Sequence, residues 1–281
     1  MPPDTSDAPD ADASHDEPSD PATEQWRAML MGTDPSLFDM RRRWRRLPSS
    51  PRCKVCAAPF GGLGRVATRL IMHGPSLKNP LMCNICFGQL RQHPGGAEID
   101  ISILFADVRG STGLAERLGA HRFQKLIQTF YRLSAKTIEH QDGVVDKFLG
   151  DGVMALFIPV LTGEDHAGRA ITAATDLLRA VAASADLMSA DFGVGVGVHR
   201  GTAFTGVVGS DDRLDFTALG DAVNVAARLG GVAGPGELVV SRAAWDGPDR
   251  DPAVPSTSIE VAGRSEPLDV VTIRPTESVA A

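Results

Sequence analysis

The sequence lacks any apolar run long enough to span a membrane, and its N-terminus lacks the basic-then-apolar pattern of a signal peptide. We therefore expect a soluble, cytoplasmic protein without a membrane span. Cysteine is scarce: the 281 residues contain only 4, in two Cys-x-x-Cys pairs. This usage favours metal binding in a reducing compartment over disulfides. The net charge of −7 is uneven along the chain and therefore indicates little about partners.

Composition divides the chain into five segments. Residues 1–24 have no Lys or Arg and few apolar side chains, so we expect a disordered acidic tail. Residues 25–50 predict a basic helical segment, broken near 32–35. Its arginines and Trp44 could contact nucleic acid, anionic lipid or the acidic tail. We favour a solvated helix packed against the next module over nucleic-acid binding. The remaining segments are a four-cysteine module at 51–92, a large domain at 97–275 and a disordered tail at 276–281.

The four-cysteine module combines Cys53 and Cys56 with Cys83 and Cys86. Four thiolates satisfy the tetrahedral coordination of Zn²⁺, and so small a module has too little apolar core to fold without a staple. Iron–sulfur clusters use the same ligands and remain the alternative. His73 lies between the pairs and is expected to be a bystander. We predict a zinc-ribbon-like module around a structural zinc ion.

Hydrophobic periodicity predicts the elements of the large domain. The expected strands are 99–106, 144–149, 153–157, 192–199, 202–209, 214–219, 238–241, 257–261 and 268–273. The expected helices are 121–140, 167–181 and one that begins after Gly220. The first six elements follow the order strand, helix, strand, strand, helix, strand. This order predicts an α+β, ferredoxin-like βαββαβ domain with extra strands and with one sheet face covered by helices.

Turn and cap signals separate these elements. Gly150-Asp151-Gly152 is typical of a tight hairpin turn, because glycine tolerates positive φ. A second turn is expected at Arg200-Gly201, between two strands. The segment 162–165 resembles a capping box, and Ser111 or Thr112 is expected to cap the helix after the first strand.

Polar residues at the strand ends are the candidates for chemistry. Asp107 follows the first strand, Asp151 tips the hairpin, and Lys147 precedes it by four positions. Asn224 and Arg228 share a helix face, where an amide and a guanidinium suit a ribose and a phosphate. From these residues alone, a solvated hairpin and an ordinary surface pair remain open alternatives.

Three motifs, in this order, resemble those of the class III nucleotidyl cyclases. Residues 105–110 (FADVRG) resemble the first metal motif of that family. Residues 146–151 (DKFLGD) resemble its base-recognition lysine followed by the second metal aspartate. Residues 215–228 resemble its second base-recognition position and its transition-state Asn and Arg. The resemblance covers about 99–273, roughly two-thirds of the chain.

The resemblance implies an adenylyl cyclase in signal transduction, which converts ATP into 3′,5′-cyclic AMP and pyrophosphate at a homodimer interface. It implies two Mg²⁺ or Mn²⁺ ions per site, held by Asp107, Asp151 and the backbone carbonyl of Val108. Asn224 and Arg228 would be catalytic, and Arg264 would bind the terminal phosphates. In the homodimer the two aspartates of one chain would face the remaining site residues of the other.

Lys147 and Thr217 would select the base. An ammonium only donates and adenine N1 only accepts, whereas a threonine hydroxyl can accept from the adenine amino group. A guanylyl cyclase is an alternative, and so is a catalytically silent cyclase-like binding module. Two positions depart from the family pattern. Ser111 stands where many relatives carry Phe, and Gly195 where some carry a phosphate-binding Arg.

Overall fold

The structure is a computed structural model that describes most of the chain. The described residues are 20–47, 49, 51–62, 64, 66, 74–77, 80–92, 94–210, 213–247, 250–261 and 266–275. Both expected tails fall largely outside this set, as do His73 and Arg264. Helix α1 (Pro21–Met31) begins within the segment expected to be a disordered tail, and the Asp20 carboxylate caps it by accepting from the Ala22 N–H.

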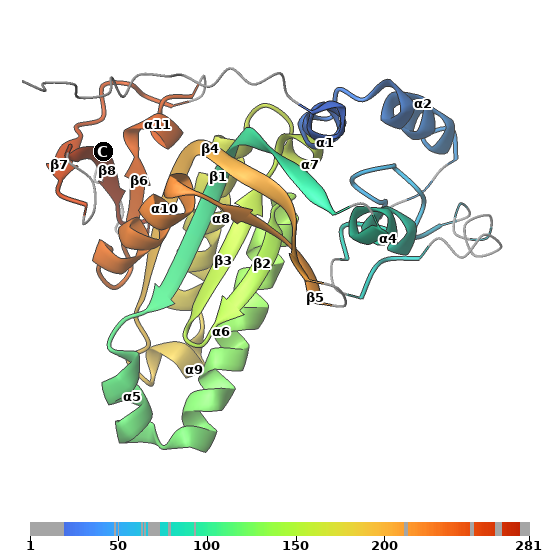
Figure 1. The fold of residues 1–281 in the computed structure, drawn as a ribbon. Helices are drawn as coiled ribbons and strands as arrows, with labels where there is room; N and C mark the ends of the chain where they lie inside the picture. Colours follow the sequence, from blue (N-terminus) through green and yellow to red (C-terminus); the bar gives the residue numbers. More distant parts are fainter. Residues whose placement is uncertain are drawn as a thin grey trace, which may run out of the picture.

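A mixed eight-stranded sheet forms the body of the molecule (Figure 1). Its order is β2-β3-β1-β4-β6-β8-β7, and β5 pairs with β4. The strands are β1 Gly95–Val108, β2 Val144–Leu149, β3 Gly152–Phe157, β4 Val194–Ser210, β5 Arg213–Leu219, β6 Leu238–Ser241, β7 Thr257–Ile259 and β8 Leu268–Ile273. The pairing of β4 with β6 is parallel, whereas the other pairings are antiparallel. The β4-β1-β3-β2 part, with its two long helices, confirms the expected ferredoxin-like α+β fold.

Helices cover both faces of this sheet. In the large domain they are α5 Ser111–Leu118, α6 Ala120–His140, α7 Pro159–Thr162, α8 His166–Ala182, α9 Ala185–Met188, α10 Asp221–Val232 and α11 Arg242–Trp245. The N-terminal region adds α2 Pro35–Trp44 and α4 Asn84–Gln92 to α1. In Figure 1, α8 lies behind the sheet and α10 in front of it, while α1, α2 and α4 gather at one end.

Strand β1 is buried on both sides because its alternate residues enter two different cores. Leu104 and Ala106 pack with Phe130 of α6 and Leu177 of α8. Ile101 and Ile103 point the other way, into a core shared with α10, α1 and the four-cysteine module. The sheet therefore has a second covered face in addition to the one expected. The second cover comes from parts of the chain that lie outside the βαββαβ pattern.

Strand β4 is continuous where a turn was expected. Arg200 pairs with Ser102 and Gly201 with Ile101, so the ladder to β1 runs unbroken through the predicted turn. The guanidinium of Arg200 also contacts Asp100 at 2.6 Å. A neighbouring strand of 14 residues supplies hydrogen-bond partners along this stretch, and this outweighs the local turn preference of glycine.

The two predicted caps are also wrong. Helix α8 is capped by Asp165, whose carboxylate accepts from the Gly168 N–H at 3.0 Å. Thr162 belongs to α7 instead, where its hydroxyl donates to the Ile158 carbonyl. Helix α5 begins after Gly110 without a side-chain cap, because Ser111 is already its first helical residue. The predicted cap Thr162 thus lies in the short helix before the true cap, Asp165. The predicted cap Ser111 lies one position after the true N-cap, Gly110.

Helix α10 packs so close to β4 that only glycine fits at Gly197. A Cβ there would lie 2.1 Å from the Gly230 nitrogen and 2.5 Å from the Leu229 carbonyl carbon. Both neighbours are backbone atoms, which cannot turn away as a side chain can. We therefore expect Gly197→Ala to lower the free energy of unfolding by about 3 kcal/mol, the upper end for overpacking. Denaturation by urea, followed by circular dichroism, measures this loss.

Gly231, on α10 itself, provides the control for this contact. A Cβ at Gly231 would meet no atom within 4 Å, so Gly231→Ala should leave stability unchanged or raise it slightly. Equal urea midpoints for the two variants would contradict the close approach of α10 to β4.

The N-terminal region is joined to the sheet by polar contacts as well as by its core. The Lys54 ammonium lies 2.5 Å from the Asp142 carboxylate, just before β2. Arg27 of α1 donates to the Glu98 carbonyl of β1 at 2.7 Å. Across the part of the chain that the structure describes, no helix has the length and apolar character needed to cross a bilayer.

Candidate active site

Two carboxylates meet where the first strand ends and the hairpin turns. Asp107 is the register partner of Gly152, and the Val108 N–H donates to the Asp151 carbonyl at 3.1 Å. Gly152 leaves room for the Asp107 carboxylate, since a Cβ there would lie 3.3 Å from Asp107 Oδ1. Burial raises the pKa of Asp107; Arg109 lowers it in part, and the nearby Asp151 raises it further. The structure thus brings the two predicted metal ligands together.

The hairpin tip that carries Asp151 is anchored to helix α6. Gly150 adopts φ +70°, a left-handed conformation that glycine accepts without steric cost. The Tyr131 hydroxyl of α6 donates to the Gly150 carbonyl, and its ring stacks on Phe148 with centroids 4.1 Å apart. These contacts fix the turn, and with it the place of the Asp151 carboxylate beside Asp107.

This pair of carboxylates fits divalent cations. Two acidic groups at one point repel each other, and a cation with hard oxygen ligands relieves that repulsion. Arg109 partly does so here: it pairs with Asp107 and donates to the Gly231 carbonyl at 2.8 Å. Among the described residues of the large domain only these two carboxylates converge here, so a bound ion would take its other ligands from backbone carbonyls such as that of Val108, from water and from a substrate.

The two predicted base-recognition residues both contact Asp146. The Thr217 hydroxyl of β5 donates to Asp146 Oδ2 at 2.6 Å, and the Lys147 ammonium lies 3.6 Å from the same oxygen. Residues 71 positions apart in the sequence are therefore joined through one carboxylate. Thr217 is buried, whereas Lys147 is about two-fifths exposed and can reach a ligand.

Asn224 and Arg228 lie on the face of α10 that points away from the sheet. The buried residues of this helix include Ala222, Val225 and Leu229, as the periodicity predicted. Asn224 is exposed and Arg228 half-buried. Among the described residues neither side chain has a hydrogen-bond or ion-pair partner, so both are available to bind a ligand.

Gly195 has a structural reason for its departure from the family pattern. A Cβ at this position would lie 2.4 Å from the Ala233 carbonyl oxygen. The segment that follows α10 therefore leaves no space for an arginine on this part of β4. A cationic contact to the terminal phosphates therefore has to come from another residue. The predicted candidate, Arg264, lies outside the described residues.

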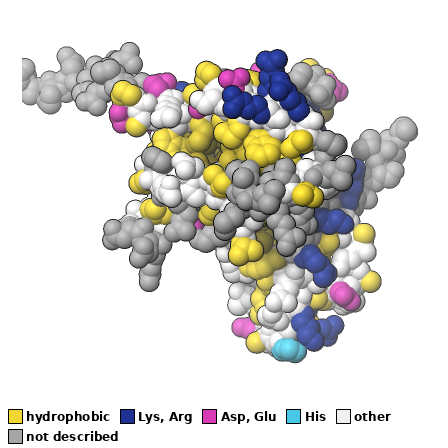
Figure 2. Space-filling model, turned by 90° about the vertical axis from the view of Figure 1, so that its right-hand side faces the viewer, with side chains coloured by type: hydrophobic (Ala, Val, Ile, Leu, Met, Phe, Trp, Pro, Cys, Tyr) yellow, Lys and Arg dark blue, Asp and Glu magenta, His cyan; other side chains and the backbone are white. Residues whose placement is uncertain are grey.

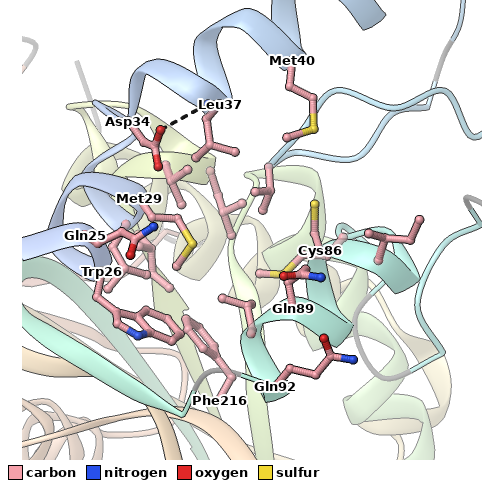
Figure 3. A pocket seen from close by; sticks show the side chains of 18 of the residues that line it. Gln25, Trp26, Met29, Asp34, Leu37, Met40, Cys86, Gln89, Gln92 and Phe216 are labelled. Carbon is pink, nitrogen blue, oxygen red and sulfur yellow. Dashed lines mark hydrogen bonds between the residues drawn. The ribbon is translucent and has the colours of Figure 1, made fainter. Parts of the chain in front are cut away.

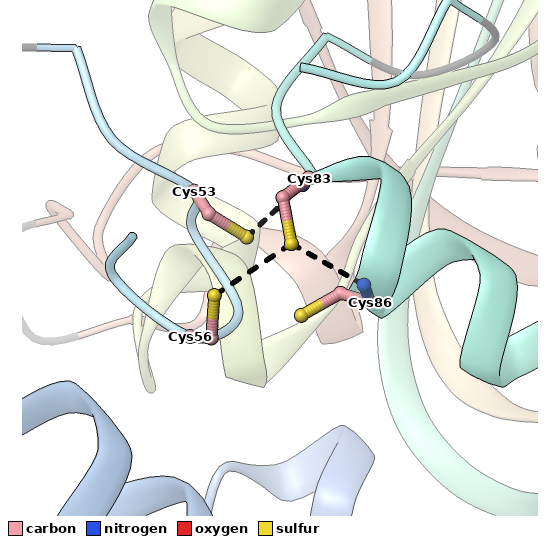
Figure 4. Close-up of side chains that lie close together, drawn as sticks. All are labelled: Cys53, Cys56, Cys83 and Cys86. Carbon is pink, nitrogen blue, oxygen red and sulfur yellow. Dashed lines mark hydrogen bonds between the residues drawn. The ribbon is translucent and has the colours of Figure 1, made fainter. Parts of the chain in front are cut away.

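The four cysteine sulfurs converge at one point, as Figure 4 shows. All four lie within 4.8 Å of one another, and the sulfurs of Cys56 and Cys83 are 3.8 Å apart. Tetrahedral Zn–S bonds of about 2.3 Å would separate the sulfurs by about 3.8 Å. Two backbone N–H groups, of Cys83 and Cys86, also point at cysteine sulfurs at 3.2 Å. The geometry suggests a single structural metal ion.

A cavity of about 740 Å³ lies next to this cluster, between α1, α2, α4 and the sheet (Figure 3). Figure 2 shows apolar side chains around a hollow on this face. Trp26, Leu37 and Phe216 are among the lining residues, and Asp34, the single charged residue of the described lining, is occupied as the cap of α2. None of the described lining residues is cationic, so the cavity does not suit a triphosphate. Phe216, which lines the cavity, directly precedes Thr217 in the sequence.

The contacts that Asp146 and Arg109 make in the site were not predicted from the sequence. Both residues lie inside the quoted motifs, but no role was assigned to either. A β-bulge at Asp146 re-aims its side chain: Val145 pairs with Ala155 and Lys147 with Met154, which leaves Asp146 unpaired between them. An acidic residue beside a lysine within an otherwise apolar strand was the available signal.

Comparison with known proteins identifies the large domain. Residues 97–265 match the family model described as the adenylate and guanylate cyclase catalytic domain. An adenylate cyclase from Anabaena cylindrica is 34% identical over 140 residues, which are 47% of this chain and 27% of that protein. The chain therefore spans only about a quarter of the length of that relative.

Solved structures of both substrate types are similar to the fold. The guanylyl cyclase Cya2 has a TM-score of 0.58 at 25% identity, covering 63% of this chain and 92% of that one. The adenylyl cyclase CyaB from P. aeruginosa has a TM-score of 0.55 at 26% identity, covering 62% and 92%. Since the matched domain is more than half of the chain and includes each of the motifs described above, the protein belongs to the class III adenylate and guanylate cyclase family.

Proposed function

We propose that the protein is an adenylyl cyclase, which converts ATP into 3′,5′-cyclic AMP and pyrophosphate at the interface of a homodimer. The observation that carries the proposal is the meeting of Lys147 and Thr217 at Asp146 within one protomer. The similar solved structures include an adenylyl and a guanylyl cyclase at nearly equal identity, so overall similarity favours neither nucleotide. The residues that face the base must therefore decide between ATP and GTP.

The reaction needs geometry and charge more than covalent chemistry. The ATP 3′-hydroxyl attacks the α-phosphate, and pyrophosphate leaves. Asp107, Asp151 and the Val108 carbonyl would hold two Mg²⁺ or Mn²⁺ ions. When bound, these ions would supply positive charge that stabilises the ionised 3′-oxygen and the leaving pyrophosphate. Asn224 would orient the ribose by hydrogen bonding. The Arg228 guanidinium would neutralise charge on the α-phosphate.

Base selection follows from donors and acceptors. The Lys147 ammonium can only donate, and it would meet adenine N1, which only accepts. The Thr217 hydroxyl would accept from the adenine amino group. Guanine reverses both positions, since its N1 carries a proton and its O6 accepts. The mismatch would leave polar groups unpaired, at a cost of about 1–3 kcal/mol for each group.

A second copy of the chain completes the site. Lys147 and Asp151 lie on one hairpin, too close to hold the base and the phosphates of one nucleotide. The hairpin also exposes Phe148 and Leu149, which are 45% and 46% accessible, as an apolar surface that suits a partner. In the two-fold dimer each site would combine two sets of residues: Asp107 and Asp151 from one protomer, and Lys147, Thr217, Asn224, Arg228 and Arg264 from the other.

We further propose that the four cysteines hold a structural zinc ion. A single ion needs four sulfurs at the corners of one small tetrahedron, and the close sulfur spacing supports this. In a four-iron cluster each thiolate binds a different iron, which would hold the sulfurs farther apart. Metal analysis and the absorption spectrum separate the two, because a zinc site is colourless and an iron–sulfur site is brown.

A direct assay tests the proposed function. The purified 281-residue chain is incubated with ATP or GTP, with Mg²⁺ or Mn²⁺, and the product is identified by mass. We expect cyclic AMP from ATP, and for GTP a kcat/KM at least tenfold lower, as one mismatched polar contact implies. Cyclic GTP as the main product would indicate a guanylyl cyclase. Tight nucleotide binding without any product would indicate a binding module.

A further inference from the structure

We propose that Asp146 is a positioning residue that makes this site select adenine over guanine, by fixing the direction of the Thr217 hydroxyl. The inference rests on the proposed function and adds to it a residue that does not touch the nucleotide. It concerns one carboxylate, with 1% of its side chain exposed, between the two base-facing side chains.

The direction of the Thr217 hydroxyl follows from its partner. An ionised carboxylate has no proton to give, so in the 2.6 Å contact the Thr217 hydroxyl has to donate. A hydroxyl carries only one proton. Once that proton points at Asp146, the oxygen can offer only lone pairs to a base, and Thr217 becomes an acceptor.

An acceptor at Thr217 matches adenine and opposes guanine. The adenine amino group donates, whereas guanine O6 accepts, so two acceptors would face each other in the guanine complex. Without its partner, the Thr217 hydroxyl could rotate and donate to guanine O6. Threonine alone therefore does not discriminate between the bases, but threonine held by a carboxylate does.

Asp146 can act in this way because of its place in the strand. The β-bulge leaves Asp146 out of the β2–β3 register and allows its side chain to reach β5. Burial raises the pKa of Asp146, and nearby Asp215 also raises it, while the hydrogen bond from Thr217 and the charge of Lys147 lower it in part. The assays are run at pH 8, because a higher pH favours the ionised carboxylate.

The test compares nucleotide preference in Asp146→Asn with that of the wild type. An amide of the same shape can either donate to Thr217 or accept from it, so the hydroxyl is no longer fixed. The ATP-to-GTP ratio of kcat/KM should fall about tenfold to a hundredfold. Thr217→Ala should lower the ratio similarly, and the double variant should lower it no further, because Asp146 acts through Thr217.

Asp142→Asn is the matched control. Asp142 is also a partly buried aspartate beside the same hairpin, but it contacts Lys54 and Arg169 rather than Thr217. It should leave the ratio unchanged. A merely structural role of Asp146 would lower kcat/KM for both nucleotides alike, and an unchanged ratio in folded Asp146→Asn overturns the proposal.

A binding measurement keeps this test separate from that of the proposed function. MANT-labelled ATP and GTP report the same preference as a ratio of Kd values without turnover. A wild type that binds ATP more tightly, forms no cyclic product and loses its preference in Asp146→Asn would refute the cyclase activity and support the part of Asp146. A wild type that forms cyclic AMP but binds both nucleotides equally would overturn the part of Asp146 and leave the proposed function standing.

Discussion

Two inactive variants should recover activity when they are combined: a chain with Asp107→Ala and a chain with Asn224→Ala. Loss of a metal-binding carboxylate should lower kcat about a thousandfold, and loss of the ribose-orienting amide about a hundredfold. In a heterodimer both defects fall in one site, and the second site is intact. Random pairing of equal amounts should therefore restore about a quarter of wild-type activity. The measurement is cyclic AMP formation by the mixed and co-refolded chains.

The control for this mixture pairs Asp107→Ala with Asp151→Ala. These two residues serve the same half of a site, so each site of that heterodimer keeps one defect and no activity should return. If both mixtures gave the same activity, with heterodimers demonstrated by mass, the sites would not be shared between the chains. Full activity in the Asp107→Ala chain alone would remove this aspartate from the reaction.

The second large effect is expected at the four-cysteine cluster. Cys83→Ser removes the sulfur that lies 3.8 Å from that of Cys56 and that accepts the Cys86 N–H. Structural zinc contributes about 10–16 kcal/mol of binding free energy in small zinc modules, so its loss should unfold the N-terminal region. Because Cys53, Cys83 and Met82 share a core with the sheet, the melting temperature of the whole chain should fall. Metal content per chain and differential scanning calorimetry measure both effects.

Lys54→Met is the control for the cysteine variant. Lys54 lies between Cys53 and Cys56 and contacts Asp142, but it is no ligand. This variant should keep one metal ion per chain and lose little stability, since a partly exposed ion pair contributes about 0–1 kcal/mol. A Cys83→Ser chain that melts like the wild type would show that the metal does not support the fold.

Local patterns in the sequence predicted the elements that carry the site. Apolar alternation marked β1 up to Asp107, and the glycines marked the hairpin around Asp151. Helical spacing assigned the buried face of α10, which leaves Asn224 and Arg228 on the other side. Each of these signals lies within about a dozen residues, where backbone preference and burial agree.

The features that escaped prediction depend on contacts between distant segments. The continuity of β4 through Gly201 depends on its pairing with β1. The second face of the sheet is covered in part by a module that precedes the sheet in the sequence. The part of Asp146 depends on a bulge and on Thr217, 71 positions away. Neither periodicity nor turn propensity contains such pairings, so only the fold could reveal them.

The central claim is that two carboxylates of one protomer and the base-facing residues of its partner act on one nucleotide. A crystal structure with Mn²⁺ and an ATP analogue that cannot cyclise tests it most directly. The account predicts anomalous manganese density at Asp107 and Asp151, with the adenine of that nucleotide against Lys147 and Thr217 of the second chain. Manganese bound away from both aspartates, or base and phosphates held by a single chain, would contradict it.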